Sequence, residues 1–284
     1  HYPLRRQRQM CIRDRPEVET TRRGVMPWIK SQQITDMSVR QASLRWPVTD
    51  GIEERVIGQR VLDVTRRAKY LIIKLEKGSM LVHLGMSGSL RVVEPKAEWR
   101  KHDHIELSFG NGAVLRYHDP RRFGSWLWSL GDHHQLMHLG PEPLLSEFSG
   151  EHLWKLSRSR KIAVKPFIMD NKVVVGVGNI YGSEALFRSG IRPDRSAGRV
   201  SRKRYDVLAG HIKDVLKAAI DQGGTTLRDF VNSSGEPGYF QQTLSVYGRG
   251  GKQCVACDSV LREIRLGQRS SCLLYTSPSP RDVE

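Results

Sequence analysis

A short segment of the chain combines two arginines with an aromatic ring on a predicted turn. Asp119-Pro-Arg-Arg-Phe-Gly124 places Arg121 and Arg122 beside Phe123, between two predicted strands. Arginine supplies positive charge and hydrogen bonds, and a phenylalanine ring can enter a base step and unstack it. The segment is therefore compatible with a wedge that enters DNA, and also with a surface turn whose phenylalanine packs in the core.

A glycine-rich segment precedes a predicted helix. In Gly176-Val-Gly-Asn-Ile-Tyr181, Asn179 is expected to cap a helix that runs to about Ser189 and ends at Gly190. Glycines before the cap let another chain approach the backbone closely, and the free amides of a helix N-terminus bind phosphate. An ordinary capped helix is the alternative interpretation.

Three further segments hold side chains that can contact a nucleic acid. His83-Leu-Gly-Met-Ser-Gly88 puts Met86 on a tight turn after a strand, as a flexible apolar finger or as core filler. Arg66-Arg-Ala-Lys-Tyr70 opens an apolar strand, where Lys69 can clamp a phosphate, donate a proton or stay at a solvated strand end. The histidines of Lys101-His-Asp-His104 can contact DNA or lie at a strand edge; metal binding ranks last because no matching ligand set is nearby.

The four cysteines are too few for a disulfide scaffold in a chain of 284 residues. Cys254 and Cys257 form a C-x-x-C pair, which is half of a zinc site or, as the less favoured alternative, a redox pair. The other two cysteines are Cys11 and Cys272.

The elements that must position these residues change from strands to helices along the chain. The pattern between Val61 and Trp128 predicts short strands, including Tyr70–Leu75, Met80–Leu84 and Val114–Tyr117. Apolar and polar residues alternate over 105–109, and Gly110-Asn-Gly112 then supplies a hairpin turn. Short strands in succession predict a sandwich or a barrel.

After Pro143 the pattern predicts helices. One helix is expected to start at the cap Ser201 and to end at Gly223-Gly224. The apolar residues of its predicted buried face are Val207, Leu208, Ile212, Val215, Leu216, Ala219 and Ile220. A strand block followed by a helix block predicts an α+β protein with two domains and a cleft between them as the natural site.

The chain is strongly basic: 46 Lys and Arg stand against 30 Asp and Glu, a formal net charge of +16. Such an excess attracts polyanions, of which nucleic acid is the commonest in a cytosol; a generically basic surface is the alternative. No apolar run approaches the ~18 residues of a membrane span. The basic N-terminal stretch lacks the apolar segment of a secretory signal, so a cytosolic protein with no membrane partner is expected.

In this order, these segments resemble those of the bacterial formamidopyrimidine-DNA glycosylase family. The resemblance extends from about Pro16 to Arg269. The matching segments are Pro16–Thr20, Arg66–Tyr70, His83–Leu90, Lys101–His104, Asp119–Gly124, His138–Pro143, Gly176–Tyr181, Gln222–Thr226 and Tyr247–Arg249.

The resemblance implies a β-sandwich at 16–143, a helix–two-turns–helix domain at 144–245 and a zinc hairpin at 246–284, after an atypical leader at 1–15. It implies a monomeric base-excision repair enzyme of the bacterial cytoplasm, associated with the nucleoid through DNA. Such an enzyme flips oxidised purines, 8-oxoguanine and formamidopyrimidines, out of double-stranded DNA. It excises them and then cuts the strand by β,δ-elimination.

The resemblance also implies roles for individual residues. Met86, Arg121 and Phe123 match residues that fill the void left by the flipped base. Lys69 and Asn179 match phosphate-binding residues, and Lys69 is also assigned to β-elimination. The remaining matches are His102 and Arg160 as DNA contacts, Lys165 near the base pocket, and Arg269 as the hairpin arginine that grips phosphates and joins Lys69 in the catalytic set.

The N-terminal segment departs from the family. Members begin Met-Pro-Glu-Leu-Pro-Glu-Val-Glu; after Met removal the proline amine attacks the sugar C1′ and holds the DNA as a Schiff base, while the adjacent Glu transfers protons. Counting back from Pro16, these positions are Arg13 and Asp14. A peptide nitrogen cannot form a Schiff base, so the chain is expected not to excise bases by this route.

The C-terminal segment departs as well. The second C-x-x-C pair of the family falls on Leu274 and Ser277, and Cys272 is out of register by two positions. A closed structural zinc site needs four ligands. Cys254, Cys257 and Cys272 supply at most three, so weak or absent zinc binding is expected. Because both departures lie at the ends, these ends are interpreted as sequence foreign to the family.

Two other functions stay open. One is a catalytically dead protein that binds lesion-containing DNA without a covalent adduct. The other is an endonuclease VIII-like glycosylase, which prefers oxidised pyrimidines. The segments Pro16–Thr20 and Lys101–His104 favour the purine-specific branch.

Overall fold

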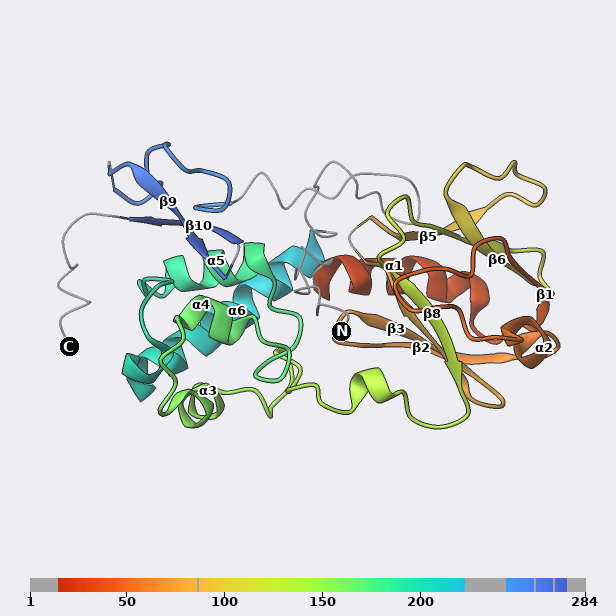
Figure 1. Cartoon of the computed structure of the whole chain (residues 1–284), viewed down its shortest axis with the longest axis horizontal. Coiled ribbons are helices and arrows are strands. Elements are labelled where there is room, and N and C mark those ends of the chain that lie inside the picture. The colour runs from red at the N-terminus through yellow and green to blue at the C-terminus, as the bar shows by residue number, and fades with distance from the viewer. Residues whose placement is uncertain (1–14, 86, 223–243, 258, 268, 275–284) are drawn as a thin grey trace, which may run out of the picture.

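The computed structural model describes residues 15–85, 87–222, 244–257, 259–267 and 269–274. A strand-rich lobe lies at one end of the molecule and a helical lobe at the other, with a two-stranded hairpin beside the helical lobe (Figure 1). Helices α1 (Arg15–Ile29) and α6 (Arg202–Asp221) contact each other between the two lobes. The predicted change from strands to helices is confirmed, with α1 as an additional helix ahead of the strands.

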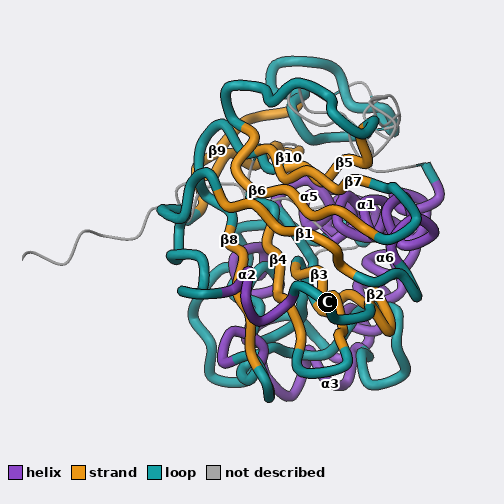
Figure 2. Tube along the Cα trace, turned by 90° about the vertical axis from the view of Figure 1, so that its right-hand side faces the viewer, coloured by secondary structure: helices purple, strands orange, loops and turns teal. Residues whose placement is uncertain are grey.

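The strand-rich lobe is a sandwich of two four-stranded antiparallel sheets, seen from its own end in Figure 2. One sheet has the order β2-β3-β4-β8, formed by β2 (Val61–Arg67), β3 (Tyr70–Leu75), β4 (Ser79–His83) and β8 (Ser125–Ser129). The other has the order β1-β6-β7-β5, formed by β1 (Ile34–Val39), β6 (Asp103–Phe109), β7 (Val114–His118) and β5 (Ser89–Val93). The sandwich is therefore confirmed over the barrel.

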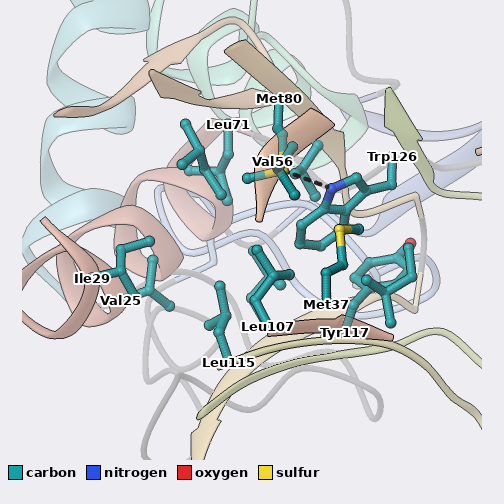
Figure 3. Close-up of a cluster of buried hydrophobic side chains, with 14 of the residues drawn as sticks. Val25, Ile29, Met37, Val56, Leu71, Met80, Leu107, Leu115, Tyr117 and Trp126 are labelled. Carbon is teal, nitrogen blue, oxygen red and sulfur yellow. Dashed lines mark hydrogen bonds between the residues drawn. The ribbon is translucent and has the colours of Figure 1, made fainter. Parts of the chain in front are cut away.

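Side chains from both sheets and from α1 fill the space between the sheets (Figure 3). The rings of Trp126 and Tyr117 are fully buried and meet edge to face, with centroids 5.7 Å apart. The Trp126 indole donates a hydrogen bond to Met80 Sδ at 3.4 Å. Val25 and Ile29 of α1 reach the same core because residues four apart share one helix face. This packing holds the strand ends, and the turns between them, in fixed positions.

The helical lobe contains α3 (Gly150–Ser157), α4 (Val164–Ile168), α5 (Asn179–Arg188) and α6 around a second hydrophobic core. Ser201 caps α6 as predicted, since its side chain accepts a hydrogen bond from the Arg204 amide at 3.4 Å. Val207 was predicted on the buried face but is 47% exposed. It lies about 100° around the helix from the buried Leu208, which is enough to turn it toward solvent. The predicted end at Gly223-Gly224 lies outside the described residues.

The C-terminal hairpin consists of β9 (Leu261–Leu266) and β10 (Arg269–Leu274). Val246, Cys254, Leu261 and Cys272 form a small buried cluster under it, against Phe187 of α5. The shorter elements of the chain are α2 (Ile52–Val56) and the 3-10 turns η1 (His134–Leu136) and η2 (Ala197–Arg199). Across the described ranges, no helix combines the length and the apolar character that crossing a membrane requires.

Candidate nucleic-acid interface

One edge of the sandwich collects the turns that carry the predicted site residues. Tyr70, His83 and Ser125 lie in register in one sheet, and Ser89, Asp103 and His118 lie in register in the other. The β2–β3, β4–β5 and β7–β8 turns and the start of β6 therefore meet at this edge. The described site residues at this edge are Lys69, His102, Arg121 and Phe123.

The turn that carries Lys69 is anchored by a carboxylate from the connection between the lobes. Ala68, in the left-handed region with φ 54°, donates its amide hydrogen bond to Glu142 Oε1 at 2.6 Å. Arg66 forms a salt bridge with Glu142 at 2.9 Å and donates to the Ala68 carbonyl at 2.7 Å. Arg67 donates to the carbonyl of Gly140 at 2.7 Å. The backbone beside Lys69 is thus fixed by the inter-lobe connection.

Helix α1 is tied to the same turn. Arg66 forms a second salt bridge, to Glu19 of α1, at 3.2 Å. Burial raises the pKa of Glu19, but hydrogen bonds and charges from Arg22, Arg23 and Arg66 outweigh burial and hold that pKa below its usual value. Glu19 is therefore ionised at neutral pH and joins α1 to the β2–β3 turn.

His83, at the end of β4, is a neutral histidine among cations. Complete burial, together with the charges of Arg45 and Lys69, lowers its pKa to about 3. Its Nδ1 accepts a hydrogen bond from the Gly85 amide at 3.1 Å, so the ring proton resides on Nε2. At neutral pH this imidazole can donate a hydrogen bond, and it adds no charge to the edge.

The β7–β8 turn presents an arginine stacked on an aromatic ring. Arg121 is exposed, and its guanidinium carbon lies 5.2 Å from the centre of the Phe123 ring. Phe123 is only half buried and is not part of the sandwich core, so the alternative of a core-packed phenylalanine is wrong. Arg122 adopts the left-handed conformation with φ 54°. Met86, on the neighbouring β4–β5 turn, lies outside the described residues.

His102 lies where β6 begins. Its ring contacts those of His104 and His118, with centroids 6.5 and 6.0 Å away. Its carbonyl accepts the Asp119 amide hydrogen bond at 2.9 Å, which joins the start of β6 to the β7–β8 turn. This half-buried imidazole and the Arg121 guanidinium therefore belong to one connected surface.

In the helical lobe, Asn179 is the first residue of α5 and not its cap. The cap position is taken by Gly178, whose extended backbone (φ −94°, ψ −173°) leaves Asn179 inside the helix. The predicted end is confirmed, since α5 stops at Arg188 and Gly190 follows with φ 64°. Among the described residues, no group hydrogen-bonds the buried Asn179 Oδ1. A buried amide in this state at a helix N-terminus is suited to an external ligand.

The remaining predicted residues lie around the hairpin and α3. Lys165 of α4 is 1% exposed, and its Nζ donates to Ser271 Oγ at 2.6 Å and to the Ser270 carbonyl at 3.1 Å. It therefore joins α4 to β10. Arg269 opens β10 and is half buried, and Arg160 is exposed just after α3.

The cysteines do not assemble a closed metal site in the described part of the chain. Cys254 and Cys272 are buried in one cluster, whereas Cys257 is exposed. The Ala256 amide donates to Cys254 Sγ at 3.4 Å. No group of three or more His, Cys, Asp and Glu side chains among the described residues is placed to hold a metal. A structural zinc site needs four ligands, so these residues do not fit one; Ser277 lies outside the described residues.

Two buried acids, Glu142 and Asp119, organise the turns without having been assigned a role from the sequence. Both stand inside matching segments, beside prolines and in a basic chain. A lone acid in such a setting is the signal that could have drawn attention to them. Their partners are distant in sequence, as with Ala68 and Glu142, and no local pattern identifies such pairs.

Comparison with known proteins follows the same division of the chain. The profile of the formamidopyrimidine-DNA glycosylase N-terminal domain matches residues 14–126, and that of the formamidopyrimidine-DNA glycosylase H2TH domain matches residues 139–231. The formamidopyrimidine-DNA glycosylases of Pseudomonas putida and Pseudomonas aeruginosa are each 57% identical to this chain over 258 residues. The alignment covers 90% of this chain and 96% of each relative.

Solved structures of formamidopyrimidine-DNA glycosylases have the same fold as this chain. Lactococcus lactis Fpg in complex with DNA containing an abasic site superposes with a TM-score of 0.85 at 28% identity, over 92% of this chain and 98% of that one. The MutM (Fpg) protein of Thermus thermophilus superposes with a TM-score of 0.83 at 32% identity, over 94% and 97% of the two chains. Because the matching profiles span most of both lobes and close relatives share more than half of its residues, the chain belongs to the formamidopyrimidine-DNA glycosylase family.

Proposed function

We propose that this protein acts in base-excision repair by binding oxidised purines in double-stranded DNA, the substrates of its family of glycosylases and apurinic/apyrimidinic lyases, and that base excision itself depends on the N-terminal segment. The observation that carries the proposal is the exposed Arg121 guanidinium stacked on the half-buried Phe123 ring, at an edge that also holds Lys69. Charge attracts the backbone, and an apolar ring supports an unstacked base step. A Lactococcus lactis Fpg variant was solved with DNA containing Fapy-dG, which fits the same substrate class.

The proposed role of each site residue follows from its place in the structure. Arg121 and Phe123, with Met86 of the adjacent turn, enter the space of the flipped base. The proposed phosphate contacts are Lys69, His102, Arg160, Asn179 and Arg269. Lys69 also serves the elimination step. Lys165 is too buried to meet DNA directly, so we propose that it acts through the hairpin that carries Arg269.

Affinity measurements on damaged and undamaged DNA test this function. Duplexes that carry 8-oxoguanine, a formamidopyrimidine or an oxidised pyrimidine are compared with an undamaged duplex of the same sequence, at one salt concentration. Preference for the first two supports the proposal. Preference for the pyrimidine lesion supports the endonuclease VIII-like alternative, and equal affinity for all four contradicts both.

For the chemistry, we propose that the chain with Arg13 and Asp14 binds lesions without forming the family's covalent intermediate. In that reaction a free proline amine attacks C1′, the bond from C1′ to the base breaks, and the base leaves with a proton. The C1′–O4′ bond of the sugar then breaks, with a proton going to O4′, as the iminium forms. A variant in which Met-Pro-Glu-Leu replaces residues 1–15 restores the family start ahead of Pro16. Its matched control keeps residues 1–12 and carries the same Pro-Glu-Leu at positions 13–15, so that the proline nitrogen is a peptide nitrogen.

Borohydride reduction on an 8-oxoguanine duplex separates the outcomes. We expect a trapped adduct with the variant that begins Met-Pro-Glu-Leu, and none with the control whose proline is internal or with the unchanged chain. An adduct of the unchanged chain would contradict the proposal that its N-terminal segment is catalytically silent. Binding without an adduct in all three would favour a lesion-binding protein.

The hairpin of the family is expected to hold one zinc ion. The described cysteines of this chain supply fewer than the four ligands that a structural zinc site needs. We propose that Cys254 and Cys257, with Cys272 as a third ligand, hold zinc weakly. If bound, zinc would brace the hairpin and take no chemical role. Equilibrium dialysis that finds one tightly held zinc per chain would contradict this.

For organisation, we propose a monomer of the bacterial cytoplasm, associated with the nucleoid, with the division into a leader at 1–15 and domains at 16–143, 144–245 and 246–284. The two hydrophobic cores, one per lobe, support the boundary near residue 143. Light scattering reports the mass in solution. Limited proteolysis that cuts first within 16–143, and not between the domains, would contradict this division.

A further inference from the structure

We propose that the buried carboxylate of Asp119 is a positioning residue that couples the β4–β5 turn to the β7–β8 turn, so that Arg121 and Phe123 are held in one position at the edge proposed to meet DNA. The inference rests on the proposed function for its consequence in DNA binding. The coupling itself is a property of the free protein. The β4–β5 turn is defined here by residues 84, 85, 87 and 88, and the β7–β8 turn by residues 119–124.

Asp119 is completely buried, and its carboxylate has partners on both turns. Oδ1 accepts the Ser87 hydroxyl at 2.9 Å and the Arg121 amide at 3.3 Å. Oδ2 accepts the Gly124 amide at 2.9 Å and the Tyr117 hydroxyl at 3.0 Å. The Ser87 bond crosses from one turn to the other, while the amide bonds close the second turn around Arg121 and Phe123.

The backbone of Asp119 adds a third segment to the unit. Its amide donates to the His102 carbonyl at 2.9 Å, and its carbonyl hydrogen-bonds His104 Nε2 at 2.8 Å. The Arg122 amide donates to the same carbonyl at 3.2 Å, which supports the left-handed conformation of Arg122. One residue thus connects both turns and the start of β6.

Close backbone contact makes the unit rigid. A Cβ on Gly85 would lie 2.6 Å from the Gly124 amide nitrogen and from the Phe123 carbonyl carbon. A Cβ on Gly124 would lie 1.8 Å from the Tyr117 hydroxyl. The two turns therefore pack main chain against main chain at Gly85, with no room for a side chain between them.

The ionised state of Asp119 matters because it lets both carboxylate oxygens accept hydrogen bonds. The partners of its carboxylate among the described residues are hydroxyls and amides, and no described cation forms a salt bridge with it. A carboxylate accepts at both oxygens. An Asn accepts at only one and would turn an amide donor toward another donor, either the Gly124 or the Arg121 amide. Asp119→Asn thus keeps the shape and breaks the unit, and Ser87→Ala removes only the bond between the turns.

The first experiment uses hydrogen exchange in the free protein. We expect Asp119→Asn to speed amide exchange at least tenfold in both turns, and Ser87→Ala to speed it several-fold in both. Ser89→Ala is the matched control, because Ser89 is buried at the start of β5 and is not a partner of Asp119. Unchanged exchange at the β4–β5 turn in both test variants would overturn the coupling, whatever the protein binds.

The second experiment reads the consequence in DNA. The probe is a duplex with a tetrahydrofuran abasic site and 2-aminopurine in the opposite strand, whose fluorescence reports unstacking. We expect both test variants to lose most of the fluorescence change and about tenfold of the preference for damaged duplex, with affinity for undamaged duplex within twofold. Equal losses on both duplexes would overturn a positioning role. Absence of any preference in the unchanged protein would instead remove the proposed function, and exchange would still decide the coupling.

Discussion

At the scale of single residues, His83 shows how burial sets a protonation state at the edge proposed to meet DNA. The imidazole accepts a hydrogen bond at Nδ1 and lies near Arg45 and Lys69. Its pKa of about 3 means that the ring is neutral at neutral pH. The edge therefore keeps a hydrogen-bond donor at Nε2, and the repulsion of a third cation is avoided.

This protonation state predicts how stability depends on pH. In the unfolded chain His83 titrates near 6.5, whereas in the folded protein it titrates near 3. Between these values the unfolded state binds the extra proton, so stability is full above pH 6.5 and falls as the pH drops toward 3. We expect this group alone to lower the folded-to-unfolded ratio about 20-fold between pH 7 and pH 5.

Urea unfolding of the unchanged protein and of His83→Gln at pH 7 and pH 5 measures this contribution. The variant is expected to be less stable at pH 7 but to lose less stability on acidification, because glutamine does not titrate. The other histidines contribute equally to both proteins. If the two lost the same stability between pH 7 and pH 5, His83 would have to be protonated in the folded state.

At the scale of elements, the carboxylate of Glu142 attaches the segment that connects the two lobes to the β2–β3 turn. Glu142 binds Arg66, Arg67 and the Ala68 amide. Glu142→Gln removes the negative charge that pairs with the guanidinium groups of Arg66 and Arg67. Loss of one partner from partly buried ion pairs of this kind costs about 3 kcal/mol of unfolding free energy. Glu147→Gln is the control, since Glu147 is exposed on the same connection. Chemical denaturation measures both; equal stability of the two variants would show that the anchor is dispensable.

A second carboxylate holds the segment that leads to the hairpin. Glu184 of α5 is 1% exposed and accepts the amides of Ser245, Val246 and Tyr247, each at 2.9 Å. Glu184→Gln retains one acceptor oxygen and sets an amide donor against backbone donors, so we expect a loss of about 2 kcal/mol.

The loss at Glu184 should be local. Hydrogen exchange is expected to increase at residues 245–247 and in β9 and β10, with α3 unchanged. Asp214→Asn, an exposed change on α6, serves as the control. A uniform increase over both lobes would mean that Glu184 supports the global fold and does not act as a local tether.

The elements that the sequence predicted well are those with a local signal. The alternation over 105–109 and the turn at 110–112 led to β6 and β7, and Ser201 identified the start of α6. The cap of α5 was wrong by one residue, because Gly178 can take the extended cap conformation as readily as asparagine can. The setting of Glu142 and Asp119 beside prolines could have singled them out, but their partners had no local signal, since those partners lie far apart in the chain and meet only after the sheets pair.

At the scale of the whole molecule, the two packed lobes each carry residues that we propose to contact DNA. The strand lobe contributes the edge with Lys69 and Arg121, and the helical lobe contributes the start of α5 at Asn179 (Figure 1). Contacts of α1 with β2, β5 and α6, and the hydrogen bond from the Tyr181 hydroxyl to Glu17 at 2.9 Å, connect the lobes. The connection is therefore built from packing and from a buried hydrogen bond within the protein.

The net charge of +16 predicts salt-sensitive binding, and the fold predicts which cations cause it. Each phosphate neutralised by the protein releases counterions, so the logarithm of the binding constant falls with the logarithm of salt by about 0.9 per contact. Lys69→Gln should reduce this slope by about 0.9, because Lys69 lies at the edge proposed to meet the backbone. Lys155→Gln, with a side chain 66% exposed on α3 and paired with Glu151, should leave the slope unchanged. Fluorescence anisotropy with an abasic duplex over a salt series measures both slopes. Equal reductions of the slope in both variants would mean that the overall positive charge attracts DNA and that the edge makes no special contribution. A reduction confined to Lys69→Gln would place the DNA backbone at the β2–β3 turn, which Glu142 holds in place.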